Sequence, residues 1–553
     1  MKQQNFISKQ QCLGLFQLLL ILMLPGLQRA TGQTYKMYHK AASSINPLYF
    51  SVKDLAFNPS LEGIVIGGEL RYQTTSNQAY GYTFETGLDG YESRNQSIIV
   101  NTTNGRDAFN FGGVALDANN KTYICGSYAS DLNNPNAMTE KTISGLDVDG
   151  KLMWAKMEGS HHFGDITYDR DDNALIAIGS PDGVWTASQP LSIVKIGTDG
   201  ALMRYKTIYD PVYSNSVKVV DLPSNQGYLI CAVFDTMGLK APYIIHLDQG
   251  LRTIWSFVYS DFLQEFDVQD MAYHEDGYIA VVGNSYDPIT EDTDAFLMSL
   301  DMSGNFRFMR KYQVDRQGQT EHYGVAAFSH SVDSTLKGFL ISGAFEPAQG
   351  TAMKHAIVFQ TDLEGTPEWS HDYSNLPGQD FEEIEEAKRI IFLNGKDMFA
   401  VAGEYTRYLQ GQQARKFIWS AKASIRKGQL VDDGLCSSPV KINYLSDTLG
   451  IYKAGQDSTI GSLTNFSYGF TDVGFHSQAC SYDFNDHSDR ATNLENLRSQ
   501  TPDAMEVFDL SGRKITNTTN LDVSQLKDLQ RGLYLLRYFK QGTFLYSEKV
   551  VLP

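Results

Sequence analysis

Short apolar runs and polar loops alternate along most of this chain, and the alternation repeats every 51 to 60 residues. In each repeat one apolar run ends on a small residue, at Gly67, Gly126, Gly179, Ala232, Gly283, Gly343 and Gly403. A second apolar run leads to a turn that closes on glycine, at Gly90, Gly150, Gly200, Gly250, Gly304, Gly365 and Gly428. Two markers that keep one register indicate seven copies of one structural unit.

One unit, from His162 to Ile208, contains four short β-branched or aromatic segments separated by Asp, Asn, Gly and Pro. Those separators supply turns and positive φ angles, so each unit is predicted to be a small antiparallel sheet. A sheet of this size buries its faces only against neighbouring copies, which is typical of propeller blades. The pattern predicts an all-β chain whose main part is a seven-bladed β-propeller with four-stranded blades.

Large rings recur four or five residues after the turn glycines, at Trp154, Tyr205, Trp255, Phe308 and Trp369. These positions open the fourth strand of their units. We expect the rings to pack between adjacent blades, because a large side chain there can bury most of its surface.

The seventh unit lacks a fourth strand, because no apolar run follows Ile425. The segment from Thr34 to Lys40 has the pattern of a fourth strand without a unit of its own. We predict that it completes the last blade, so that no open edge remains between the first and last blades. This closure resembles that of WD-type propellers.

The chain is longer than one such propeller requires, so further modules are expected. Lys2 and Lys9 precede an apolar stretch that ends at Leu24, followed by small residues, which predicts a secretory signal peptide over residues 1–33. No later segment is apolar for about 18 residues, so no membrane span is expected in the mature chain. We divide the rest into the propeller (34–433), a disulfide-containing linker or extra β segment (434–503) and a C-terminal domain (504–553).

The net charge of -18 argues against a nucleic-acid partner, because such partners are bound largely through Lys and Arg. Cys125 and Cys231 fall in predicted second strands and are expected to be buried thiols. Cys436 and Cys480 flank the region after the propeller, and in an exported protein they are predicted to form a disulfide; two free thiols are the alternative.

The last 50 residues predict a small β-sandwich, with turns at Gly512 and Gly532 and alternating polarity from Leu533 to Tyr538. The segment "VFDLSGR", the step from Leu526 to Leu536 and the final "KVV" resemble the C-terminal sorting domain of the type IX secretion system of Bacteroidetes. The matching residues are Asp509, Gly512, Arg513, Gly532, Tyr534 and Lys549. The Pro-Asn-Pro start of that family is missing. The resemblance implies export to the cell surface or the medium by the type IX machinery; an ordinary terminal β-domain is the alternative.

No G-x-S-x-G, H-E-x-x-H or GKS-type motif is present, so no catalytic residues are predicted. The Asp-x-x-Gly turns, such as Asp301 to Gly304, are similar to the Asp-box of sialidase propellers. We interpret them as turn chemistry, because Asp and Gly at this spacing are what a tight strand connection requires.

Three acidic runs, at residues 169–173, 287–294 and 380–387, are candidate cation sites, because calcium takes several oxygen ligands from loops. The best is the second, with Asp287, Glu291, Asp292 and Asp294. None has the spacing of an EF-hand loop, and solvated surface is the alternative. No other cofactor is expected.

An aromatic residue recurs near the start of the first strand in six units, at Phe50, Phe111, Phe163, Phe266, Tyr323 and Phe381. The residue before it varies. With a WD-like strand order these preceding residues enter the central channel from one face, where propeller ligands bind. The candidate ligand-binding residues are His162, Glu265, His322 and Asp380.

We therefore expect a secreted or cell-surface propeller that acts as a binding or adhesion scaffold for an extracellular glycan or protein, exported by its C-terminal domain. One alternative is an extracellular propeller enzyme that acts on glycans or uses a quinone-type cofactor. Another is a structural component of a surface layer. A fold alone does not decide between them.

Overall fold

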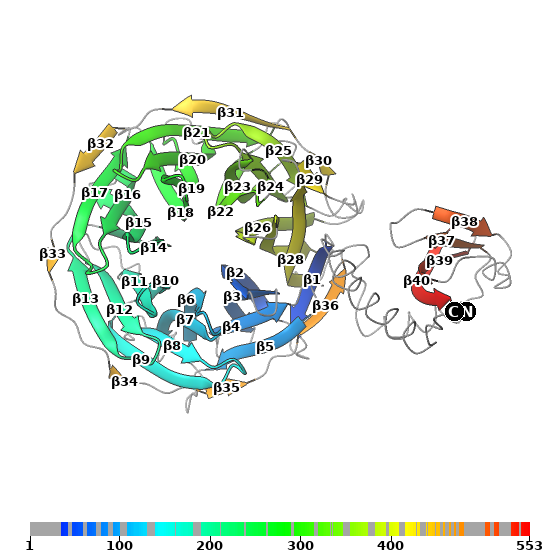
Figure 1. The fold of residues 1–553 in the computed structure, drawn as a ribbon, viewed down its shortest axis with the longest axis horizontal. Helices are drawn as coiled ribbons and strands as arrows, with labels where there is room; N and C mark the ends of the chain where they lie inside the picture. The colour runs from blue at the N-terminus through cyan, green and yellow to red at the C-terminus, as the bar shows by residue number, and fades with distance from the viewer. Residues whose placement is uncertain are drawn as a thin grey trace, which may run out of the picture. The chain divides into compact units, whose positions relative to one another are not determined.

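The repeats form a closed ring of seven blades in a computed structural model of the chain (Figure 1). The structure describes residues 35–41, 47–58, 63–72, 79–86, 92–99, 108–129, 139–160, 162–180, 190–210, 212–236, 239–260, 264–288, 292–314, 319–331, 333, 336–346, 354–373, 382–393, 397–408, 415–426, 429–431, 438–439, 441–447, 450–453, 457–458, 464–465, 469–471, 475–479, 504–508, 514–518, 532–540 and 543–552. Two units are distinguished, Met1–Cys480 and Ser481–Pro553. The predicted leader, residues 1–33, lies outside the described residues.

Each blade is an antiparallel sheet whose first strand is innermost and whose fourth strand is on the outer side of the ring (Figure 1). The first three blades comprise β2 (Pro47–Asn58), β3 (Gly63–Tyr72), β4 (Ala79–Thr86), β5 (Glu92–Ile99); β6 (Ala108–Leu116), β7 (Thr122–Ala129), β8 (Thr139–Leu146), β9 (Leu152–Ser160); and β10 (His162–Asp169), β11 (Ala174–Ser180), β12 (Leu191–Gly197), β13 (Leu202–Ile208). Blades 4 to 6 comprise β14 (Val212–Leu222), β15 (Gly227–Thr236), β16 (Leu239–Leu247), β17 (Thr253–Ser260); β18 (Glu265–His274), β19 (Tyr278–Tyr286), β20 (Thr293–Asp301), β21 (Phe306–Val314); and β22 (Thr320–Ser329), β23 (Lys337–Phe345), β24 (His355–Thr361), β25 (Pro367–Asp372). The predicted blade architecture is confirmed.

The seventh blade takes its fourth strand from the N-terminal end of the described chain, as the sequence predicts. Its own strands are β26 (Glu382–Leu393), β27 (Met398–Tyr408) and β28 (Arg415–Arg426), and β28 ends in a hairpin with β29 (Gln429–Val431). β1 (Tyr35–Ala41) pairs antiparallel with β28, with Met37 opposite Ser420. The first and last parts of the propeller sequence therefore share one sheet.

A belt of short strands, which the blade repeat does not predict, follows the propeller in sequence and runs around the outside of the ring. Its strands are β30 (Ser438–Pro439), β31 (Ile442–Asp447), β32 (Gly450–Lys453), β33 (Asp457–Ser458), β34 (Thr464–Asn465), β35 (Gly469–Thr471) and β36 (Phe475–Ala479). They pair antiparallel, in this order, with the outermost strands of blades 6, 5, 4, 3, 2, 1 and 7. The compact unit Met1–Cys480 therefore includes both the blades and the belt.

The belt covers the outer edge of every blade. A fourth strand without a neighbour exposes N–H and C=O groups that invite pairing with another chain. The longest contact, between β31 and β21, places Tyr444 opposite Tyr312, and the belt ends on β1, with Met37 opposite Ala479. In Figure 1 the belt strands form the outermost circle of arrows. The ring is consequently closed by β1 within blade 7 and by the belt around all blades.

The apolar core is divided among the blade interfaces. Among the described residues, six clusters of buried apolar side chains each draw on two adjacent blades. Cys125 and Cys231 are buried free thiols in two of these clusters, as predicted. Cys436 and Cys480 lie outside the described residues, so their predicted disulfide stays a prediction.

Rings at the start of the fourth strands pack on the next blade's turn, as predicted. Trp154 Nε1 donates to the carbonyl oxygen of Thr198 at 2.9 Å, and Trp255 Nε1 donates to that of Met302 at 3.0 Å. At Gly304, where φ is +79°, an added Cβ would lie 2.7 Å from Phe257 Cδ2. This turn therefore needs glycine for its backbone conformation and for the close approach of the neighbouring blade.

The Asp residues of these turns cap their own backbone. Asp301 Oδ1 accepts from the N–H of Ser303 at 2.8 Å and of Asn305 at 2.9 Å. The same pattern recurs at Asp147 and Asp362. The turn interpretation of the Asp-x-x-Gly sequence is therefore confirmed.

The second unit contains one described antiparallel sheet, in the order β38-β37-β39-β40. Its strands are β37 (Ala504–Phe508), β38 (Lys514–Thr518), β39 (Gly532–Lys540) and β40 (Thr543–Leu552). Gly532 and Tyr534 lie in β39 and Lys549 lies in β40, opposite Leu535. Asp509, Gly512 and Arg513 lie outside the described residues. Within the described residues no helix is long and apolar enough to cross a membrane.

Candidate functional site

Every first strand carries a β-bulge or a longer interruption where it faces the central channel. The pairing with the second strand shifts register in all seven blades. The residue left out just before pairing resumes is Lys53, Gly112, Gly164, Val217, Gln269, Tyr323 or Lys388, in blade order. We call these seven residues the bulge ring. Bulges re-aim side chains and are common beside binding and catalytic sites.

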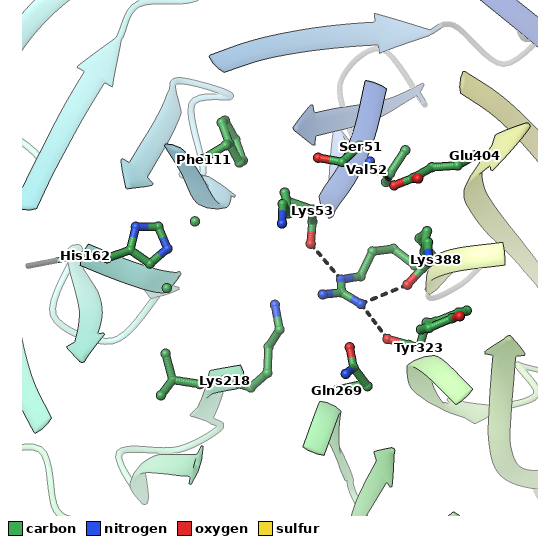
Figure 2. A pocket seen from close by; sticks show the side chains of 14 residues that line it. Ser51, Val52, Lys53, Phe111, His162, Lys218, Gln269, Tyr323, Lys388 and Glu404 are labelled. Atoms are coloured by element: carbon green, nitrogen blue, oxygen red, sulfur yellow. Dashed lines mark hydrogen bonds between the residues drawn. The ribbon is translucent and has the colours of Figure 1, made fainter. Parts of the chain in front are cut away.

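The bulge ring surrounds a pocket of about 230 Å³ in the channel, which we call the channel pocket (Figure 2). All seven blades contribute to its wall, through Ser51, Val52, Lys53, Phe111, Gly112, His162, Gly164, Val217, Lys218, Gln269, Tyr323, Lys388, Arg389 and Glu404. Every member of the bulge ring is among them. The blades otherwise repeat one pattern, but the bulge ring combines five residue types: lysine, glycine, valine, glutamine and tyrosine.

His162 is the one candidate ligand residue that lines the channel pocket. Its Nδ1 lies 3.2 Å from Ser127 Oγ of the preceding blade. Glu265 instead forms an ion pair with Lys240 at 3.3 Å, away from the lining residues. Asp380 lies outside the described residues. The structure therefore does not bring the four candidates together.

His322 is fully buried between blades 5 and 6 rather than in the channel. Its ring centroid lies 5.5 Å from that of Tyr312 and 5.3 Å from that of Phe359. Its Nδ1 lies 3.2 Å from the carbonyl oxygen of Phe296, and burial lowers its pKa to about 4. This imidazole is a neutral core group.

The recurring aromatic residue of the first strands does not keep one position relative to the bulge, so the residue before it does not face the channel in every blade. Phe163 precedes its bulge residue Gly164 directly, Phe266 precedes Gln269 by three positions, and Tyr323 is the bulge residue itself. A shift of one residue turns a strand's side chains to the opposite face. For this reason the sequence pattern did not identify four cationic lining residues, Lys53, Lys218, Lys388 and Arg389. Knowledge of the register between the first and second strands would have identified them.

The residue that follows the bulge connects adjacent blades. Asp54 Oδ2 accepts from the N–H of Val114 at 2.7 Å. Asp165 and Asp270 repeat this contact, with the N–H groups of Val219 at 2.8 Å and Val325 at 3.0 Å. Blades 1 and 2, 3 and 4, and 5 and 6 are thus joined by carboxylates that point between the blades. None of these three carboxylates is a lining residue of the channel pocket.

Cations occupy the equivalent position in blades 4 and 7. Lys218 is buried and its Nζ lies 3.4 Å from Asp165 Oδ1. The guanidinium of Arg389 donates through Nε to the carbonyl oxygen of Lys53 and through Nη1 to those of Tyr323 and Lys388. Figure 2 shows Lys218 extending toward the middle of the channel.

A second set of charges lies where blades 6 and 7 meet. Lys388 Nζ lies 2.7 Å from Glu386 Oε2 and 3.7 Å from the ring centroid of Tyr323. Lys354 bridges Glu321, at 2.9 Å, and Glu386, at 3.5 Å. These contacts fix Lys388 with its charge beside an aromatic face, a favourable arrangement for a cation.

Burial weakens the acidity of the carboxyls around the channel pocket. It raises the pKa of Asp165 to about 7, against the opposing effect of Lys218. It also raises the pKa of Asp270 and of Glu404. Glu404 is the one carboxylate in the described lining, and its Oε1 accepts from the N–H of Val52 at 2.9 Å.

In the structure, residues of the acidic runs that were candidate cation sites make other contacts. Asp294 lies 3.6 Å from Lys311 Nζ, and the backbone N–H of Asp287 donates to the carbonyl oxygen of Asp292 at 3.0 Å, while Glu291 lies outside the described residues. In the run from 169, Asp169 forms a buried ion pair with Lys195 at 2.8 Å. The described part of the chain contains no group of three or more His, Cys, Asp or Glu side chains able to hold a metal ion.

Comparison with known proteins adds little to this geometry. No protein-family model matches the chain, and no curated protein matches it. Among solved structures it is similar to a protein of unknown function from Dyadobacter fermentans DSM 18053, with 13% sequence identity and a TM-score of 0.37. That match covers 59% of this chain and 98% of the other.

Proposed function

We propose that this chain is a secreted or cell-surface binding protein whose propeller takes an extracellular ligand, a glycan or a protein, in the channel pocket. The observation that carries the proposal is the bulge ring. One residue from each of seven otherwise similar blades lines a single pocket of about 230 Å³, and these residues range in size and charge from glycine to lysine and tyrosine. Ligand sites favour such concave places, where several rigid elements converge.

Binding is favoured over glycoside hydrolysis by the choice of side chains. A glycosidase needs two carboxyl groups that flank the scissile bond. The described lining offers one, Glu404, which is already held by the N–H of Val52. The nearby Asp54, Asp165 and Asp270 are engaged with backbone groups of the next blade.

Export by the type IX machinery remains part of the proposal. It is supported by the resemblance of the tail and by the separate four-stranded sheet at residues 504–552. Deletion of residues 504–553 should leave the protein in the periplasm of a bacterium that has this secretion system. Surface delivery of the shortened chain would refute the sorting role and leave the binding proposal standing.

The binding proposal is tested by screening the mature full chain against arrays of extracellular glycans and matrix proteins. Gln269→Trp should abolish any binding that the screen detects. Gln269 is a half-buried bulge-ring residue, and the larger tryptophan side chain would fill the pocket. Met203→Trp on the outer strand β13, where the side chain is 49% exposed, is the matched control and should bind normally. Binding that survives Gln269→Trp would place the ligand elsewhere. Self-association without ligand binding would instead favour a surface-layer component.

A further inference from the structure

The channel pocket presents unused positive donors. Arg389 donates through Nε and Nη1 to backbone carbonyls, and its Nη2 forms no hydrogen bond with any described residue. Lys53 Nζ likewise has no hydrogen-bond or ion-pair partner among the described residues that surround it, although both residues line the pocket. A half-buried cation with unpartnered N–H groups favours an anion that can accept from it.

Apart from Glu404, the carboxylates near these cations do not line the pocket, although Asp165 lies 3.4 Å from Lys218 Nζ and Glu386 lies 2.7 Å from Lys388 Nζ. Asp54, Asp165 and Asp270 bond the backbone of the next blade and are not part of the lining. The lining itself contains Lys53, Lys218, Lys388 and Arg389 against Glu404 alone. The lining therefore carries more cationic than anionic side chains, on a chain of net charge -18. Salt at physiological strength screens the distant charges over about 8 Å.

The size and polarity of the pocket restrict what enters it. At about 230 Å³ it lies below the usual 300–1,000 Å³ of small-molecule sites, so it has room for one end of a larger ligand. Its apolar members Val52, Phe111 and Val217 are 4%, 2% and 2% exposed, so they offer almost no surface to a ligand. A polar wall suits hydroxyl and carboxylate groups better than the apolar or aromatic side chains that anchor protein partners.

We infer that the channel pocket binds the terminal acidic sugar of a glycan, with the carboxylate or sulfate of that sugar held by Arg389, Lys53 and Lys218. This inference rests on the proposed function and narrows it to one class of ligand. Arg389 supplies the remaining N–H donors of its Nη2, and the two lysines supply point charges. Gln269 and His162 line the same pocket, beside the position proposed for the sugar.

The test is isothermal titration calorimetry of the mature full chain with matched sugars: galacturonate, galactose 6-sulfate and galactose. We expect at least one acidic sugar to bind at least tenfold more tightly than galactose, and the preferred one identifies the anion as carboxylate or sulfate. Lys53→Met should weaken that binding roughly tenfold, the value of one charge-assisted contact. Lys240→Met removes the same charge outside the pocket and should change nothing.

Equal affinity for galactose and the acidic sugars, or unchanged affinity in Lys53→Met, would overturn the inference. Tighter binding of a glutamate-terminated peptide than of either acidic sugar would overturn it too, in favour of an acidic peptide. If galactose binds and Gln269→Trp abolishes that binding, the proposed function stands and only the anion preference fails. If neither the sugars nor any component of the arrays binds, both fail together.

Discussion

The guanidinium Nε of Arg389 donates a hydrogen bond of 2.7 Å to the carbonyl oxygen of Lys53, a residue 336 positions earlier in the chain. This contact joins the last blade to the first on the inner side of the ring. On the outer side, β1 joins the same two ends by completing blade 7. Glu404 Oε1 adds a third connection through the N–H of Val52. The ring is closed at its seam by a side-chain contact in the channel, a shared sheet and the belt.

Arg389→Lys should weaken this seam. A lysine keeps the charge but cannot reach three carbonyl oxygens in the fixed geometry of a guanidinium. We expect the free energy of unfolding to fall by about 2 kcal/mol, as for the loss of one or two hydrogen bonds to a charged group. Urea unfolding measures this change. Arg252→Lys, whose side chain is 86% exposed, should unfold like the wild type. Equal stability of all three proteins would mean that Arg389 does not hold the seam.

Removal of the belt should expose seven strand edges at once. A chain that ends at residue 431 lacks β30 to β36, and we expect it to melt at a lower temperature and to self-associate, since open edges pair with other chains. Size-exclusion chromatography and thermal melting measure both effects. The control is a chain that ends at residue 480, which lacks only the second unit and should elute and melt without the additional self-association or loss of stability. Identical behaviour of the two chains would refute a protective role of the belt.

Gly304→Ala should cost more than Gly277→Ala. Both glycines have φ near +80°, so alanine strains both backbones by about 1 kcal/mol. An added Cβ at Gly304 also approaches Phe257 of the preceding blade to 2.7 Å, whereas at Gly277 the nearest atom is Met302 Cγ at 3.6 Å. We expect an extra loss of about 1–2 kcal/mol at Gly304 from overpacking. If urea unfolding gives equal losses, the ring does not press on the turn.

The sequence repeat predicted the blades because close packing between strands requires the same kinds of residue at equivalent positions of every blade. Gly67 and its counterparts do lie in the second strands, where the backbone of the first strand or a neighbouring ring leaves no room for a larger side chain. The strand predicted over Thr34 to Lys40 was found for the same reason, since blade 7 could not be completed otherwise. For residues 434–503 the sequence predicted only a linker or an extra β segment, because belt strands such as β33 and β34 have two residues each, too short for any period.

The channel pocket was only partly predictable. His162 was correctly placed at the channel, but His322 and Glu265 were not, because a bulge changes which side chain faces inward and leaves little trace in the sequence. The bulge residue differs from blade to blade: it is Gly164 in blade 3, Gln269 in blade 5 and Lys388 in blade 7. Such variety is what a binding site allows and a core position does not.

Asp221 should make stability depend on pH. Burial, reinforced by the charge of Asp169, raises its pKa to about 7, from 3.8 as the ordinary value. Between these values the folded chain holds a proton that the unfolded chain has lost, so the free energy of unfolding falls as pH rises. Asp221→Asn removes this fall. The free energy of unfolding of the variant minus that of the wild type should therefore increase by about 1–2 kcal/mol between pH 4.5 and pH 8. This value is reduced for solvent screening, because the group is half-buried.

Denaturant unfolding at the two pH values measures the Asp221 effect. Asp149→Asn, an exposed substitution on a turn, is the control and should leave the pH dependence of the wild type unchanged. A variant Asp221→Asn with the same pH dependence as the wild type would show that this carboxyl titrates as an exposed one does.

The most direct measurement is a crystal structure of the mature chain bound to the ligand that the array screen identifies. The account predicts ligand density in the channel pocket, in contact with Lys53, Arg389 and bulge-ring residues from at least three blades. Ligand density on the outer face of the belt, with the channel pocket holding only water, would contradict it.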